Sequence, residues 1–267
     1  MLIGNEPIKP KEQAQLLKPS LTHDWSLSPT KAIALQKELA QLASFRSECS
    51  LRASQLLVAG CDVSYERTNN YCFGAIIVAD YQRGQIIEEA VAAAPANFPY
   101  VPGLLSFREI PVLLEAFANL QHRPSLLFAE GQGRAHPRRF GLATHLGVIF
   151  DLPALGCAKS RLIGHHRTPA ERRGASATLL DPANGETIGA VLRTRRGVKP
   201  VYVSQGHKLS LAQCLRITLR LTGSCRMPDL LRRAHTLANE ARREHILSMP
   251  KMDVSFQDKM TLGEGPL

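Results

Sequence analysis

The chain has 267 residues, of which 44% are hydrophobic and 6% aromatic, and its formal net charge is +10. This length and composition suit a soluble α/β protein with one substantial domain. They argue against a membrane protein, because no run of about 18 apolar residues occurs. The start, "MLIGNEPIKPKEQAQ", lacks the apolar segment of a secretory signal. The six cysteines show no C-x-x-C spacing, so we expect reduced thiols in an intracellular, cytoplasmic protein.

The positive charge is concentrated in one part of the chain. Residues 134–243 contain 20 basic and 6 acidic side chains, whereas residues 1–133 contain 11 and 13. A region this basic favours a polyanionic partner, because neutralised phosphates release counterions and drive binding. A basic surface without a partner is the alternative.

The first part of the chain predicts an extension, a helix and three strands. Residues 1–24 are polar, proline-containing and aperiodic, so we expect a flexible N-terminal extension. Ser28 as N-cap and Pro29 at the first helical position predict a helix over residues 28–42. Extended runs over residues 55–66, 71–81 and 84–94, with turns at Asn69-Asn70 and Arg83-Gly84, predict an antiparallel meander.

Helices and strands alternate in the rest of the chain. The predicted helices cover residues 102–120, 143–151, 210–222 and 229–245. The predicted strands cover residues 125–130, 152–159, 187–194 and 199–205. Residues 164–175 indicate a basic surface loop, and residues 246–267 a disordered tail. This order predicts a single α/β domain over residues 25–245, with a mixed β-sheet and helices on both faces.

Three acidic residues lie where the predicted core elements would bury them. Asp62 interrupts the first strand, Glu109 lies within the helix that contains "FRE", and Glu130 ends the strand "LLFAE". A buried carboxylate is costly unless a cation, hydrogen-bond donors or a metal compensates it. If the sheet brings the first and fourth strands together, these acids indicate Mg²⁺ or Mn²⁺ acting on a phosphodiester. Taken singly, each acid has a plainer interpretation as a cap, a turn or an arginine partner.

Five longer segments occur in a fixed order: "VAGCDVSY", "FPYVPGLLSFRE", "GQGRAHPRRFGLATHLGV", "GCAKSRL" and "VSQGHKLSL". Together they resemble the endonuclease V family of deoxyinosine-specific, ribonuclease-H-like nucleases, over roughly residues 25–243. The resemblance implies a metal-dependent endonuclease that acts in the repair of deaminated DNA. It implies cleavage at the second phosphodiester 3′ of the inosine, which leaves a 3′-hydroxyl and a 5′-phosphate. Deoxyinosine-containing DNA would be the partner and Mg²⁺ the cofactor, with Mn²⁺ as an alternative. We expect a monomer.

The resemblance also assigns roles to the residues that match the family's motifs. It implies that the metal site and the catalytic machinery consist of Asp62, Glu109, Glu130, Lys159 and His207. Four of these would hold or orient the metal, and Lys159 would stabilise negative charge at the scissile phosphate. It implies a strand-separating wedge formed by Pro99, Tyr100, Val101 and Pro102. The prolines would keep this wedge stiff while the base leaves its stack. Without the resemblance, a proline-flanked surface tyrosine is the plainer interpretation.

Further residues are assigned to the base and to the DNA backbone. The residues expected at the base pocket and the substrate strand are Leu105, Gly131, Gly133, His136, Gly156 and Leu162. Glycine lets the backbone and its amides approach a flipped base closely, although a glycine pair after a strand is otherwise a turn. The arginines expected to contact the backbone are Arg138, Arg139, Arg161, Arg172 and Arg173.

The chain departs from the family at Glu130, where the family ordinarily has aspartate in "DGQG". One additional methylene displaces the carboxylate, whereas Mg²⁺ needs ligands at about 2.0–2.1 Å, and a misplacement of about 1 Å costs roughly a hundredfold in rate. Three outcomes are open: a rotamer that restores ligation, a site that prefers Mn²⁺, or a protein that binds inosine-containing or distorted nucleic acid without cutting it. An inosine-specific ribonuclease, which needs a contact to the 2′-hydroxyl, is a further alternative.

Overall fold

The antiparallel meander forms one side of the central sheet in the computed structural model, which describes residues 17–51 and 56–248. Strand β1 (Leu57–Glu66) pairs with β2 (Tyr71–Asp80), and β2 pairs with β3 (Ile86–Pro95), both antiparallel. Asn70 and Gly84 adopt positive φ angles of 54° and 69° in the two connecting turns, a conformation that glycine and asparagine tolerate. The predicted meander and its turns are therefore confirmed.

The meander continues into an eight-stranded sheet with the order β3-β2-β1-β4-β5-β8-β7-β6. Strand β4 (Leu126–Glu130) lies parallel to β1, and β5 (Ala154–Ala158) lies parallel to β4. Strands β8 (Val201–His207), β7 (Thr187–Leu192) and β6 (Ser176–Leu180) then extend the sheet in antiparallel pairs. The edge strand β6 was not predicted, because its half-exposed sequence "SATLL" carries little pattern. The predicted mixed sheet is confirmed.

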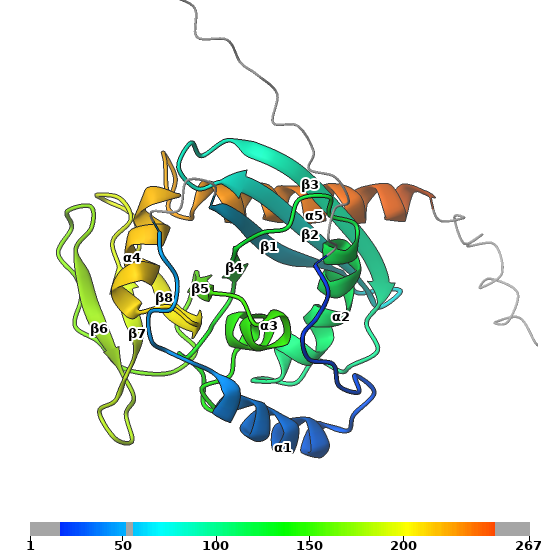
Figure 1. The fold of residues 1–267 in the computed structure, drawn as a ribbon, viewed down its shortest axis with the longest axis horizontal. Coiled ribbons are helices and arrows are strands. Elements are labelled where there is room, and N and C mark those ends of the chain that lie inside the picture. Colours follow the sequence, from blue (N-terminus) through cyan, green and yellow to red (C-terminus); the bar gives the residue numbers. More distant parts are fainter. Residues whose placement is uncertain (1–16, 52–55, 249–267) are drawn as a thin grey trace, which may run out of the picture.

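Helices cover both faces of the sheet, as predicted. Helices α2 (Leu105–Ala118) and α3 (Leu142–Phe150) share one hydrophobic core with alternate residues of β1 and β4. The intervening residues of these strands share a second core with α4 (Leu211–Arg220) and α5 (Asp229–Ser248). Figure 1 shows α5, in orange, running across β1, β2 and β3. Because strand side chains alternate between faces, each residue's position in its strand decides which helices it meets.

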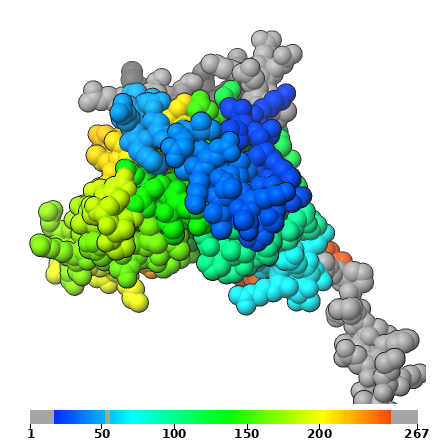
Figure 2. All heavy atoms as spheres, turned by 90° about the horizontal axis from the view of Figure 1, so that it is seen from below, coloured from blue at the N-terminus to red at the C-terminus, as the bar shows by residue number. Residues whose placement is uncertain are grey.

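The N-terminal region packs against this framework. Ser28 caps α1 (Pro29–Leu39), which continues into the short helix η1 (Ala40–Leu42). The expectation of a flexible extension over residues 1–24 is wrong for residues 17–24. Leu17 is buried in the core, and the amides of Ser20 and Leu21 both donate to the carbonyl of Ile149. Figure 2 shows this segment, in blue, lying against the green residues of the middle of the chain. Residues 1–16 lie outside the described residues.

The C-terminal helix is longer than predicted. Helix α5 extends to Ser248, so the first residues of the expected tail belong to it, and residues 249–267 lie outside the described part.

All six cysteines are free thiols. In the described ranges, no helix combines the length and the hydropathy that a membrane crossing requires.

Candidate metal centre and its surroundings

Parallel pairing of β1 with β4 brings two of the predicted acids together. Cys61 is in register with Ala129, so Asp62 and Glu130 follow as neighbours on adjacent strands. His235 reaches them from α5, with its Nδ1 at 2.7 Å from Asp62 Oδ2. One ligand atom from each of these three residues lies within 4.8 Å of the others. We call Asp62, Glu130 and His235 the metal group.

Charge in the metal group is incompletely balanced by the protein. Asp62 is only 8% exposed, and its pKa is raised to about 6, first because burial disfavours the charged form and then because Glu130 repels it. The hydrogen bond from His235 counteracts this increase in part. Two carboxylates and an imidazole at these distances are the donors of a divalent-cation site, and carboxylate oxygens suit Mg²⁺ and Mn²⁺. The residues present therefore fit the metal that the sequence implies.

Glu109 approaches the metal group from the opposite face of the sheet. It lies on α2, is buried, and accepts a short hydrogen bond from the hydroxyl of Tyr65 on β1. Burial raises its pKa to about 8, and the charges of Asp62 and Glu130 add to this increase. Glu109 lies outside the group of three but close enough to interact with it electrostatically. A cation bound at the metal group would favour its ionised form.

Lys159 supplies the positive charge nearest to Glu130. It follows β5, and its Nζ lies 2.6 Å from Glu130 Oε1. The Lys159 side chain is 46% exposed, so it borders both the acids and solvent. The longer side chain of Glu130 therefore remains in the metal group and also reaches this lysine.

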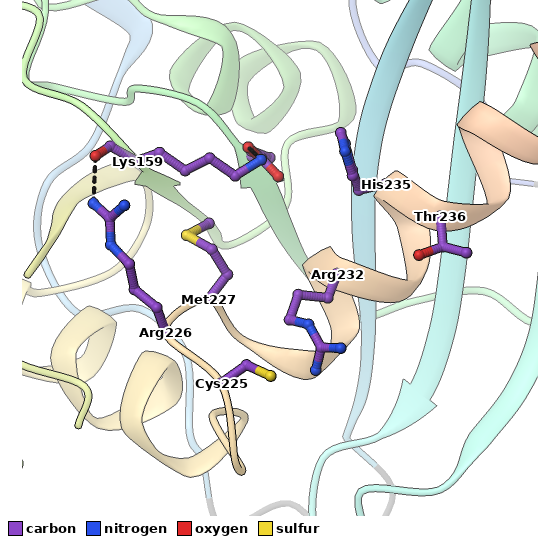
Figure 3. Close-up of a pocket in the computed structure, with 8 residues that line it drawn as sticks. Lys159, Cys225, Arg226, Met227, Arg232, His235 and Thr236 are labelled. Carbon is purple, nitrogen blue, oxygen red and sulfur yellow. Dashed lines mark hydrogen bonds and ion pairs between the residues drawn. The ribbon is translucent and has the colours of Figure 1, made fainter. Parts of the chain in front are cut away.

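A surface pocket of about 290 Å³ opens beside the metal group. Its lining residues are Glu130, Lys159, Cys225, Arg226, Met227, Arg232, His235 and Thr236. Figure 3 shows Lys159 extending across the pocket, with His235 on the far side and Arg226 below. Three basic side chains in this lining give the pocket the charge that a phosphodiester requires.

The prediction that His207 binds the metal is wrong. His207, at the end of β8, pairs with Ala154 at the beginning of β5, whereas Glu130 pairs with Cys157 three residues later. Three residues of strand span about 10 Å, so His207 lies towards the opposite ends of these strands from Glu130. Its ring accepts from the Ser44 amide at 3.1 Å and lies 3.3 Å from an Asp151 carboxylate oxygen.

The histidine of the metal group, His235, was missed from the sequence. It lies on α5 beside the buried Ala234, and its side chain is half-exposed. The helix was predicted from its apolar residues, but no motif pointed to a ligand on it. The available signal was a histidine bordering the apolar face of a helix long enough to cross the strands.

The predicted wedge is a projecting loop before α2. Tyr100 is 72% exposed, and the prolines on both sides of it are exposed as well. Gly103 ends the loop with a φ of +80°. Its carbonyl oxygen accepts hydrogen bonds from His136 Nε2 at 2.9 Å, Arg138 Nη2 at 2.8 Å and Gln36 Nε2 at 3.2 Å. We call these three donors the wedge anchor.

The wedge anchor changes the roles expected for His136 and Arg138. His136 is 3% exposed, and both ring nitrogens are used, because Nδ1 accepts from the Arg138 amide at 3.2 Å. Burial and the neighbouring guanidinium of Arg138 lower the pKa of His136 to about 4. Arg138 also donates to the Gln36 side chain. Both residues thus position the wedge, and the predicted contacts of His136 with the substrate strand and of Arg138 with the DNA backbone stay predictions.

The predicted pocket glycines are explained by close backbone packing. The Gly131 amide donates to the Cys157 carbonyl at 3.1 Å, and the Gly133 amide donates to Ser204 Oγ at 2.9 Å. A Cβ on Gly133 would lie 2.1 Å from a backbone oxygen, and one on Gly156 would lie 2.5 Å from the Gly131 oxygen. Both amides are thus engaged within the protein, contrary to the expectation that they bind the base. Of the other predicted pocket residues, Leu105 and Leu162 are exposed.

The predicted backbone arginines divide into two kinds. Arg139 pairs with Asp181 at 2.5 Å and with Glu186 at 3.0 Å. Arg173 donates to the carbonyl oxygens of residues 194, 219 and 222. These two arginines therefore brace the fold through internal bonds, and their predicted contact with DNA stays a prediction. Arg161 and Arg172 are exposed, and their side chains make no ion pair in the part of the chain that the structure describes.

The meander, the parallel β1–β4 pair with its acids and the helices on both faces define a ribonuclease-H-like protein with a candidate metal site. The family model for endonuclease V matches residues 37–236. Endonuclease V of Dehalococcoides mccartyi is 44% identical over 219 residues, which cover 82% of this chain and 96% of that protein. The chain therefore belongs to the endonuclease V family of nucleases.

Solved structures agree with this assignment. Endonuclease V from Streptomyces avermitilis is 40% identical and has a TM-score of 0.78, covering 83% of this chain and 96% of that one. Endonuclease V from Ciona intestinalis, at 23% identity, shares the fold with a TM-score of 0.69 over 81% of this chain and 98% of its own. The predicted family and the ribonuclease-H-like fold are thus confirmed.

Proposed function

We propose that this chain is a metal-dependent endonuclease that cleaves inosine-containing DNA in the repair of deaminated bases. The observation that carries the proposal is the metal group beside Lys159, at a surface pocket lined with basic side chains. The Ciona relative was solved in complex with a 24mer DNA that contains an inosine followed by a ribo-adenosine. Its ligand supports inosine-containing DNA as the substrate class.

The metal group would hold Mg²⁺, or Mn²⁺ as the alternative. When bound, such an ion lowers the pKa of a coordinated water and neutralises charge on a phosphate. Asp62 and Glu130 supply the hard oxygen ligands and His235 the imidazole. Glu109 would orient the water shell of the ion, a role supported by its electrostatic interaction with Asp62 and Glu130. Lys159 presents an ammonium group where negative charge grows on the phosphate.

The wedge supplies access to the damaged base. Tyr100 projects into solvent between two prolines, and restricted backbone torsions keep it stiff while it enters the duplex. The wedge anchor fixes Gly103, six residues before Glu109 on α2, so the wedge and the catalytic acid lie on one continuous segment. Recognition then depends on the ease with which a poorly paired base leaves its stack.

Cleavage at the second phosphodiester 3′ of the inosine is consistent with separate sites for the everted base and for the metal. If the metal group lies further along the strand than the base site, the phosphate that it reaches is offset from the inosine. The products would be a 3′-hydroxyl and a 5′-phosphate.

The proposal is tested by cleavage of a duplex with a single deoxyinosine in Mg²⁺ and in Mn²⁺, with the products mapped to nucleotide resolution. We expect one cut at the second phosphodiester and no cut in the duplex that lacks inosine. If the wild type bound the duplex in both metals without cutting it, and Glu130→Asp restored cleavage, the non-cleaving alternative would be supported instead. A matched RNA strand that is cut faster than the DNA would support the ribonuclease alternative.

A further inference from the structure

The turn between β7 and β8 concentrates positive charge without a counterion. Its sequence, residues 193–200, is "RTRRGVKP", with four cations and no acid. Arg195, Arg196 and Lys199 are exposed. Within residues 17–51 and 56–248, no carboxylate forms an ion pair with any of the three. A solvated surface normally intersperses both signs of charge, so this turn has the composition of an anion-binding surface.

The sheet topology places this turn at the same edge as the metal group. Glu130 pairs with Cys157 near the end of β5, and Ala158 pairs with Tyr202 at the start of β8. The neighbouring pair joins Val201 to the last residue of β7. The C-terminal ends of β4, β5 and β7 therefore lie next to one another on the same side of the sheet, where the strands end. Three strand spacings of about 4.8 Å separate the β7 end of the turn from Glu130, a distance of about 14 Å, and two spacings separate its β8 end.

A direct contact ties the turn to the catalytic lysine. Arg226 Nη2 donates to the backbone carbonyls of Lys159 at 2.5 Å and Pro200 at 2.8 Å. Figure 3 shows the first of these bonds as the dashed line between Lys159 and Arg226, at the left of the view. The last residue of the turn and the residue that borders Glu130 are thus held by one guanidinium.

Internal hydrogen bonds of Arg193 brace the turn. Arg193 is 8% exposed and donates across the turn to the Val198 carbonyl. It also donates to the carbonyls of Pro169 at 3.2 Å and Ala170 at 3.4 Å in the neighbouring loop, which contains Arg172. A preorganised surface loses less conformational entropy on binding than a flexible one.

We propose that Arg195, Arg196 and Lys199 form a second phosphate-binding surface for the DNA backbone. A distance of about 14 Å along the sheet edge corresponds to about four base-pair rises of 3.4 Å. The surface would therefore hold the duplex about four base pairs away from the scissile phosphate. This inference rests on the proposed function, because DNA at the metal group sets the position of the backbone.

The test compares two triple variants of the full chain. The first is Arg195→Gln/Arg196→Gln/Lys199→Gln. The matched control is Lys31→Gln/Arg83→Gln/Arg123→Gln, which removes three exposed cations elsewhere. Fluorescence anisotropy measures the affinity for an inosine duplex at a series of salt concentrations. We expect the slope of log K against log salt to become shallower by about 0.9 for each lost phosphate contact, in the first variant only.

The duplex length locates the contact. Two shortened duplexes are used, and each is cut back on one side to about three base pairs from the scissile bond. On one of them the DNA therefore ends before the proposed contact at about four base pairs. We expect the first variant to differ from wild type on one shortened duplex and to match it on the other. An unchanged slope, an equal effect of the control variant, or an undiminished difference on both shortened duplexes would overturn the proposal.

Two further measurements separate this proposal from the proposed function and from misfolding. The single-turnover cleavage rate at saturating protein should be unchanged in the first variant, because these residues do not belong to the metal group. Failure of the wild type to cut inosine DNA would defeat the proposed function. The salt slopes would still show whether the three side chains of the turn bind phosphates. The charge-conserving variant Arg195→Lys/Arg196→Lys/Lys199→Arg should restore the wild-type slope, and a failure to do so would count against phosphate binding.

Discussion

The wedge anchor and the metal group are both clusters of polar side chains, but they differ in how completely the protein satisfies them. In the wedge anchor, three donors converge on one carbonyl oxygen, and their remaining bonds also end within the protein. In the metal group, two neighbouring carboxylates repel each other, and one lysine and one histidine balance them only in part. A saturated cluster positions the chain, whereas an unbalanced one marks the place where a ligand binds.

Removing one acid tests the unbalanced cluster most severely. Asp62→Asn keeps the shape of the side chain but removes a metal-binding charge. We expect a loss of about a thousandfold in single-turnover cleavage, since metal catalysis supplies several kcal/mol and about 1.4 kcal/mol is a factor of ten. Binding to the inosine duplex should persist. Undiminished cleavage would mean that Asp62 is not a ligand.

Glu130 tests whether the longer acid contributes to catalysis. Glu130→Gln preserves its length and breaks its charge interaction with Lys159. We expect cleavage to slow by about a hundredfold, in line with the loss of one electrostatic contact at a reacting centre. Glu171→Gln, at an exposed acid in the basic loop, is the matched control and should cut at the wild-type rate. Equal rates for both variants would contradict a role for Glu130.

The saturated cluster should respond to acid through His136. Its folded-state pKa of about 4 lies below the usual value near 6.5, so the unfolded chain binds protons more readily. The stabilising contribution is therefore complete above pH 6.5 and is lost as the pH falls towards 4. We expect His136 alone to lower the free energy of unfolding by up to about 1.4 kcal/mol per pH unit in this window, while Asp62 and Glu109, whose pKa values are raised, act in the opposite direction.

Denaturant titrations at several pH values measure this loss. The neutral variant His136→Gln should show a shallower dependence on pH. The buried His145, whose pKa is also lowered by burial, and the acids with shifted pKa values contribute the dependence that remains. A variant with the wild-type slope would show that folding does not lower the pKa of His136.

Two adjacent arginines give the smallest and most selective contrast. Arg173 donates to three backbone carbonyls, so Arg173→Gln should lower the free energy of unfolding by about 1–3 kcal/mol and leave the salt slope of DNA binding unchanged. Arg172 is exposed like Arg173, but no ion pair holds its side chain in the described residues. Arg172→Gln should therefore leave stability within about 0.5 kcal/mol and reduce the salt slope by about 0.9. Thermal unfolding and anisotropy on both variants decide the matter.

Local sequence patterns predicted the elements that follow from periodicity and turn chemistry. The meander was readable because apolar strands flank residues that tolerate positive φ, such as Asn70 and Gly84. The meeting of Asp62 and Glu130 was conditional on the first and fourth strands lying side by side, a pairing that the structure shows and that local patterns did not specify.

Other features depend on tertiary partners that a single sequence does not specify. His235 joins the metal group only because α5 packs across the strands. Residues 17–24 lack periodicity because they pack as an irregular strap whose amides bond to the end of α3. The sequence likewise could not show whether an arginine such as Arg139 is paired, because its partners Asp181 and Glu186 lie more than forty residues away.

Metal titration of two histidine variants tests whether His235, and not His207, binds the metal. Calorimetric titration with Mn²⁺ in the absence of DNA should give binding to the wild type and to His207→Ala with equal affinity. His235→Ala should bind Mn²⁺ at least about tenfold more weakly, as expected when a coordinating group is lost. Loss of affinity in His207→Ala, together with wild-type binding by His235→Ala, would show that His207 and not His235 binds the ion.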